Sequence, residues 1–215
     1  TPLAPTTTPR ATTTTPRATT VDTVNGTCGG TATATVTDNG NSVSGSISYT
    51  NYCDAGVTLN GNVSFSASLN VNTDAVSLSM SFSSLGTADE TLSGSVSMTF
   101  NLVDPNAPML ISMNIVLTDA LNGNTFWIEN YTLTITPAGA VDTVQFSGTY
   151  HDFDAGHVII TTTSQLLVDN LTDVPVSGTL HFAGGAGTFA DLTFTGGGGY
   201  TLTVSTGTVI NGVLL

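Results

Sequence analysis

The chain has 215 residues, of which only 8% are charged, and its two basic residues are both Arg, so Lys is absent. Because the acidic residues number 15, the formal net charge is −13. Proteins that bind nucleic acid need Lys and Arg to neutralise phosphates, and anionic membrane surfaces attract the same side chains, so this composition argues against both partners.

Residues 1–21 are rich in Thr and Pro, and we expect them to form an extended tail. The heptad TTTPRAT occurs twice, at residues 6–12 and 13–19, and contains both Arg residues. Pro favours extended backbone, and apart from Leu3 the segment has almost none of the large apolar residues that a core requires. Pro cannot donate to a ladder, so strand pairing would be confined to residues 11–15 and 18–24. The residues that we expect to contact another subunit are Thr6, Pro9, Arg10, Thr13, Pro16 and Arg17.

Several features favour an exported protein, located outside the cell or on its surface. The chain begins at Thr1 and has no signal peptide, so we expect that a leader has been removed. No apolar run approaches the roughly 18–20 residues of a membrane-spanning helix. Two cysteines, Cys28 and Cys53, lie near the start of the folded part. In an exported chain such a pair favours a disulfide, and two buried free thiols are the alternative.

Residues 22–215 are predicted to form a single all-β domain. In the segment 75–84 the apolar residues Val76, Leu78, Met80 and Phe82 alternate with Ser, and similar alternation recurs along the chain. This period of two is that of a strand with one apolar and one polar face. Turn sequences lie between the alternating segments, at residues 38–41, 70–74, 104–108, 121–124, 137–140 and 196–199. The pattern predicts an antiparallel meander of about twelve strands, forming a sandwich or a curved, barrel-like sheet.

An internal echo suggests a weak duplication of residues 31–119 and 126–215. The tripeptide DAG occurs at residues 54–56 and at 154–156, each time after a Ser-Gly pair and aromatic residues. Shared turn chemistry is the alternative explanation.

The segment HDFDAGH is the strongest candidate for a chemical site. It places His151, Asp152, Asp154 and His157 within seven residues, and imidazoles with carboxylates can bind a divalent metal. The alternative is a polar hairpin loop whose Asp and Gly residues were selected for the turn. His181 is isolated in the sequence and is expected to be structural, and Trp127 is expected in or near the core.

The sequence does not indicate an enzyme, and we expect no cofactor apart from that metal. Only two Glu are present, the Asp residues stand mostly in turn contexts, and no GxSxG motif occurs. The Gly-rich run at residues 196–199 is not followed by a helix-forming segment, so it does not predict a phosphate-binding loop.

Poorly guarded strand edges point to self-assembly. Monomeric sheet proteins protect their edges with Lys, Pro or bulges, whereas this domain has no Lys and ends on the apolar strand sequence VINGVLL. A basic tail beside an acidic domain favours a homopolymer, that is, a structural subunit of an extracellular filament or surface assembly. The alternative is a surface-attached binding or adhesion module whose tail is a glycosylated stalk. Glycans would be carried by Thr residues or by the sequons at Asn25, Asn62, Asn130 and Asn170.

Overall fold

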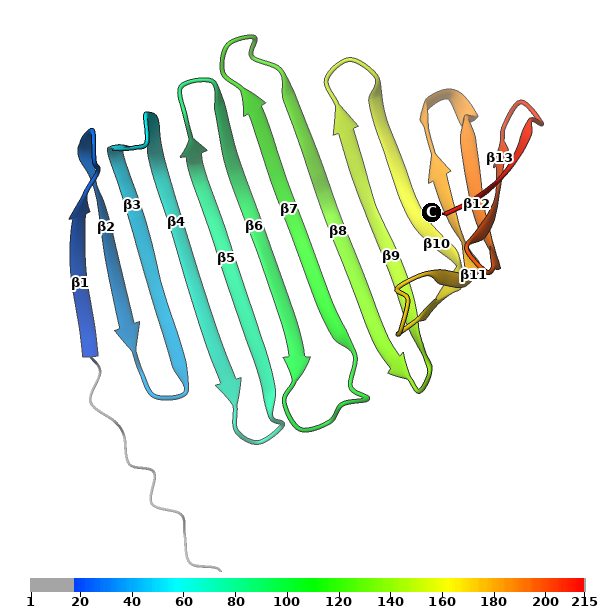
Figure 1. Cartoon of the computed structure of the whole chain (residues 1–215), viewed down its shortest axis with the longest axis horizontal. Helices are drawn as coiled ribbons and strands as arrows, with labels where there is room; N and C mark the ends of the chain where they lie inside the picture. Colours follow the sequence, from blue (N-terminus) through cyan, green and yellow to red (C-terminus); the bar gives the residue numbers. More distant parts are fainter. Residues whose placement is uncertain (1–17, 215) are drawn as a thin grey trace, which may run out of the picture.

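The computed structural model describes residues 18–214, which form one antiparallel sheet of fourteen strands in chain order. Figure 1 shows each strand beside its neighbours in the sequence. The strands are β1 (Ala18–Asn25), β2 (Gly29–Asp38), β3 (Ser42–Asp54), β4 (Val57–Asn70), β5 (Ala75–Gly86), β6 (Glu90–Asn101), β7 (Met109–Asp119), β8 (Thr125–Ala138), β9 (Val141–Asp152), β10 (Gly156–Asp169), β11 (Pro175–Ala183), β12 (Phe189–Gly196), β13 (Gly199–Val204) and β14 (Val209–Val213). A single 3₁₀ turn, η1 (Gly185–Gly187), follows β11.

The predicted all-β meander is confirmed, with two strands more than expected. The additional strands are β1 and β3, of which β1 covers the tail residues 18–24 where strand pairing was expected. β3 has Gly45 among its apolar positions, which weakens its alternation, and β1 was assigned to the tail. The tail boundary at residue 21 is therefore wrong. The stretch from Ala18 pairs residue by residue with β2 of its own chain, since Thr and Val favour extended pairing.

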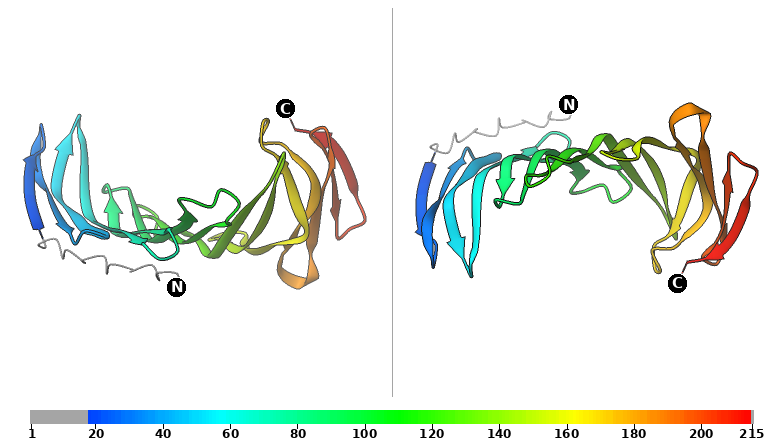
Figure 2. Two further views of the ribbon diagram at one scale, coloured as in Figure 1. Left: turned by 90° about the horizontal axis from the view of Figure 1, so that it is seen from below. Right: turned by 90° about the horizontal axis from the view of Figure 1, so that it is seen from above.

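The sheet is open, and it is neither a sandwich nor a closed barrel. β1 and β14 are its two edges. Viewed from below and from above, roughly along its strands, the sheet is one layer deep through its middle, and the strands at both ends turn away from the plane of the central strands (Figure 2). Within residues 18–214, extensive contacts join neighbouring strands only, apart from a small contact between β10 and η1. No helix in this part of the chain is long and apolar enough to cross a membrane.

A single layer buries little of its surface. Among the described residues, the buried hydrophobic side chains are Ala32, Val63, Leu166 and Phe194. The chain exposes 13299 Å², whereas a globular monomer of 21.9 kDa exposes about 9,300 Å². Even if about 2,500 Å², the most that any 17-residue stretch can expose, is subtracted for residues 1–17, the remaining surface is about 2,000 Å² above that of a globular domain of the remaining mass.

Bulges interrupt several ladders, and three of them follow the same plan. Asn51, Ser84 and Asn130 have positive φ angles of 46°, 47° and 51°, and each lies where the pairing register shifts. At each of these bulges, the backbone N–H donates a hydrogen bond to a side chain of an adjacent strand. Asn60 Oδ1 accepts the bond from Asn51, Ser93 Oγ from Ser84 and Asn114 Oδ1 from Asn130, at 2.8, 3.0 and 2.7 Å. Bulges bend the strand that carries them, so these sites contribute to the curvature of the sheet.

Glycine supports the bulges where backbones come close. Gly94 has a φ of +123°, and a Cβ at this position would collide with the carbonyl oxygen of Asn114 on β7. Only glycine combines this φ with this approach.

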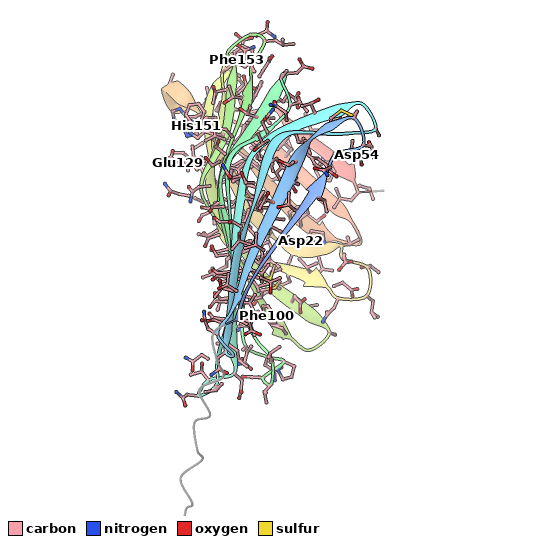
Figure 3. The ribbon with its side chains drawn as sticks, turned by 90° about the vertical axis from the view of Figure 1, so that its left-hand side faces the viewer. Asp22, Asp54, Phe100, Glu129, His151 and Phe153 are labelled. Carbon is pink, nitrogen blue, oxygen red and sulfur yellow. A yellow bond between two sulfur atoms is a disulfide. The ribbon has the colours of Figure 1, made fainter. Side chains whose placement is uncertain are left out.

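The predicted disulfide is present and anchors the N-terminal edge. Cys28 lies in the turn between β1 and β2, Cys53 lies near the end of β3, and their Cα atoms are 5.0 Å apart. In the same corner, Thr27 Oγ1 donates a hydrogen bond to Asp54 Oδ1 at 2.7 Å, close to the yellow sulfur bond in Figure 3. The edge hairpin is thus tied covalently to the third strand.

Candidate assembly surfaces

Residues directly opposite each other in an antiparallel ladder lie on the same face of the sheet. Following the pairs from β1 to β14 therefore assigns each strand position to one of two faces. One face carries mostly Ser and Thr and is called the hydroxyl face here. The other carries most of the large aliphatic and aromatic residues and is called the apolar face.

The hydroxyl face contains a row of directly paired residues that crosses the whole sheet. Its members on the first ten strands are all Ser or Thr. In order from β1 to β14 the row is Thr19, Thr37, Ser44, Ser66, Ser79, Ser97, Ser112, Thr132, Ser147, Thr161, His181, Asp191, Thr203 and Val209.

Hydroxyl groups bond across this face. Oγ1 of Thr19 and Oγ1 of Thr37 are 3.0 Å apart, and Oγ1 of Thr132 and Oγ of Ser147 are 2.7 Å apart. Over β2–β5 the face also contains a shallow hollow of about 340 Å³, lined largely by Ser and Thr. The face thus presents an ordered array of hydroxyl groups, which the segment-by-segment sequence analysis did not reveal because it depends on register.

The apolar face carries all four methionines of the chain, Met80, Met98, Met109 and Met113. One of its rows is Val43, Ala67, Leu78, Met98, Ile111, Leu133 and Phe146. Many of these side chains stay accessible, and Met80 is 44% exposed. Met adapts its shape readily to a partner surface, so this face has the character of a contact surface.

An aromatic pair packs on the apolar face over β8 and β9. Tyr131 and Phe146 meet edge to face with ring centroids 4.5 Å apart, and they line a small apolar pocket of about 180 Å³ with Gly148 and Ile160. Burial raises the pKa of the Tyr131 phenol above its ordinary value, since a phenolate would lose hydration there.

The two edges differ in their protection. On β1, Asp22 pairs with Ala34 and so lies on the apolar face, where it is exposed (Figure 3). An inward-directed charge of this kind is a guard against unwanted strand pairing, and it was not expected from the sequence. β14 contains no charged residue, and Val209 and Val213 are 54% and 66% exposed. The C-terminal edge therefore lacks the usual charged guard.

The residues of the predicted metal site are distributed between a turn and a strand surface. Asp152 Oδ1 accepts backbone N–H bonds from Asp154 and Ala155 at 2.9 and 2.8 Å, which is the role expected of a turn residue. The described residues contain no group of three or more His, Cys, Asp or Glu arranged to hold a metal ion. The geometry thus accounts for Asp152 by the hairpin alone.

His151 instead belongs to a small polar cluster on the hydroxyl face. Its Nε2 lies 3.0 Å from Glu129 Oε2 on β8, and the two residues are labelled in Figure 3. The imidazole stacks on Trp127 with ring centroids 4.0 Å apart, and His157 lies 5.5 Å away on β10. Trp127 is half-buried on this face, so its expected place in the core is only partly correct.

His181 is not isolated in the folded chain. Its Nδ1 lies 2.7 Å from Asp191 Oδ1 on β12, and its ring lies against Phe189 at 5.8 Å between centroids. Both partners are neighbours only through strand pairing, and they lie ten and eight residues from His181 in the sequence, so the sequence alone did not reveal them.

Turn carboxylates stabilise the hairpin ends. The pKa of Asp119 is lowered because its carboxylate accepts a bond from the Asn122 side chain and backbone bonds from Asn122 and Leu121. The pKa of Asp169 is lowered by backbone bonds from Leu171 and Thr172 and by the Thr172 hydroxyl. These bonds favour the ionised form of both carboxylates, which accept hydrogen bonds within their own turns.

The predicted contact residues of the tail, from Thr6 to Arg17, lie outside the described residues. Comparisons with protein-family models, curated proteins and solved structures found no match for this chain. The faces and edges of the sheet are therefore the features that bear on function.

Proposed function

We propose that the protein is a structural subunit of an extracellular filament or surface assembly, whose subunits join through the edges of the sheet and the N-terminal tail. The observation that supports this proposal is the open, single-layer sheet. It has two edge strands, of which β14 carries no charged guard, and an exposed strand edge is a template for a further strand. The disulfide fits an oxidising location outside the cytosol.

The parity of the sheet favours head-to-tail growth. All neighbouring strands are antiparallel and their number, fourteen, is even, so β1 and β14 run in opposite directions. A second copy in the same orientation can place its β1 beside β14 of the first copy and continue the antiparallel ladder. A contact of this kind does not close on itself, so it generates a filament.

Charge distribution assigns a role to the tail. The acidic residues all lie beyond residue 21, whereas both Arg residues lie at positions 10 and 17. Attraction between a tail and the next acidic domain would add to the edge contact, by about 0–1 kcal/mol per exposed pair. Most of the affinity must then come from backbone pairing and apolar burial.

The proposal is tested with Lys on the C-terminal edge. The double variant V209K/V213K places two charges on β14, where they oppose strand addition. Leu171→Lys is the matched control, because Leu171 is 94% exposed in the turn after β10 and lies on neither edge. We expect filaments from the wild type and from L171K but not from V209K/V213K in electron micrographs.

The tail is tested by a deletion that ends at residue 17, so that β1 is retained. The shortened chain should keep the circular dichroism of the sheet and assemble less readily at equal concentration. Unchanged assembly would remove the tail from the proposal and leave the edges as the only contact.

A second candidate function is a surface-attached binding or adhesion module. The ordered hydroxyl face favours it, because its hollow over β2–β5 can hydrogen-bond a polar surface or a glycan. Binding of the monomeric chain to a glycan array, without polymer in light scattering, would support this function over the first.

A further inference from the structure

No other part of the described residues covers the apolar face. Most of its side chains over the central strands are half-buried or exposed, and Leu78 and Met80 on β5 are 37% and 44% exposed. No second layer packs on it, because contacts in this region join neighbouring strands only. A monomer would leave this surface in water, at an unfavourable free energy.

The dimensions of the face match those of a stable protein–protein interface. Strands β3–β9 span about 30 Å across the sheet, since neighbouring strands lie about 4.8 Å apart. Some eight paired residues per strand extend for about 27 Å. The resulting area of about 800 Å² per copy equals one side of a standard interface.

The charges of the molecule are placed away from the centre of this face. In β3–β9 the charged residues are Asp54, Glu90, Asp119, Glu129, Asp142 and Asp152, and all except Glu129 lie at or next to a strand end. Glu90 and Asp119 oppose each other at the end of β6 and β7 that lies away from their connecting loop, and Glu129 pairs with Thr149 on the hydroxyl face. Two copies with a net charge of −13 each can therefore meet here without bringing carboxylates into the centre of the contact.

We infer that the apolar face is covered by the same face of a second copy of this chain. Two such sheets would pack about 10 Å apart, as the layers of a sandwich do. The methionines would lie between the layers, and both hydroxyl faces would point outwards to solvent. The pair then completes the sandwich core that one chain does not form. This contact adds to the proposed assembly, and it rests on that proposal only for the identity of the partner.

The test compares Lys substitutions on the two faces of one strand. The variant L78K/M80K places charges in the apolar face, and S77K/S79K places the same charges on the hydroxyl face of β5. All four residues are exposed, so either double variant should fold, which far-ultraviolet circular dichroism verifies. Both are made in the V209K/V213K chain, whose blocked edge stops filament growth, and are studied by sedimentation velocity.

The edge-blocked chain should sediment at about twice the chain mass of 21.9 kDa. Adding S77K/S79K should leave this pair intact, whereas adding L78K/M80K should reduce it to single chains. Single chains at all concentrations for the edge-blocked protein, or pairs that persist with L78K/M80K, would overturn the inference.

Oxidation of Met80 provides a readout that needs no face variant. In the edge-blocked chain, peroxide should oxidise Met80 several-fold more slowly at concentrations where pairs form than in dilute solution. A rate independent of concentration would contradict the paired faces. Sedimentation of the wild type separates the two proposals. If the wild type stops at pairs, the filament is contradicted but the face contact is supported.

Discussion

Removing the disulfide should destabilise the protein by a magnitude that follows from its position. Cys28 and Cys53 are separated by 25 positions, and in the chain-entropy model a crosslink that closes a loop of this size stabilises the fold by about 3.5 kcal/mol. The double variant C28S/C53S should lose about that much free energy of unfolding. The loss should be concentrated at the N-terminal edge, because β1 pairs with β2 alone and its turn is held to β3 by this bond.

The assay is urea unfolding followed by circular dichroism, at a concentration where sedimentation shows one species, since association itself stabilises the folded state. In the variant, the backbone amides of residues 18–38 should exchange hydrogen faster than those of the central strands. A loss of less than about 1 kcal/mol, or exchange that increases evenly over the sheet, would refute the reasoning, because native disulfides of small exported domains usually contribute 2–5 kcal/mol.

The remaining predictions concern the bulges and the turns. Gly94→Ala should lower the free energy of unfolding by at least about 1–3 kcal/mol, through its positive φ and its collision with Asn114. Gly139 has a φ of +81° but open surroundings. Gly139→Ala should therefore lower the free energy of unfolding clearly less in the same urea titration. The lowered pKa of Asp169 contributes stability above its unfolded pKa of about 4 that is lost as the pH falls through the folded pKa. Asp169→Asn should therefore show a smaller loss of stability on acidification than the wild type, and an equal loss would assign the acid sensitivity to other carboxylates.

Much of the fold could be predicted because the sequence alternates so regularly. Ser between Val76, Leu78 and Met80 leaves no ambiguity about the period, and the turns at Asn39-Gly40 and at the Gly-rich run were found in their expected places. The strands that were missed show what alternation cannot reveal. β3 has Gly45 at an apolar position, and a Cβ there would collide with the Phe65 ring and the Thr35 carbonyl, so the packing that requires glycine also hides the strand.

The arrangement of layers could not be predicted from the sequence. Alternating strands are typical of sandwiches, barrels and open sheets alike, and the choice depends on whether the apolar side chains meet others within the same chain. Here the ladder continues from strand to strand without folding back. The hydroxyl row and the pairs His151–Glu129 and His181–Asp191 likewise depend on register, which is fixed by bulges such as those at Ser84 and Asn130.

The candidate metal site shows the limit of reading a short motif. HDFDAGH contains four side chains suited to a divalent ion, but a hairpin directs alternate residues to opposite faces. Asp152 turns back to its own loop, whereas His151 lies against Trp127 and Glu129. Within this motif, Asp152 therefore belongs to the turn and His151 to the surface of the strand.

Electron microscopy of the purified full-length protein at high concentration tests the central claim most directly. If β14 of one copy pairs with β1 of the next, filaments should appear with a subunit repeat of up to about 65 Å, since fourteen strands lie about 4.8 Å apart. Isolated particles of one or two chains at every concentration would contradict the account.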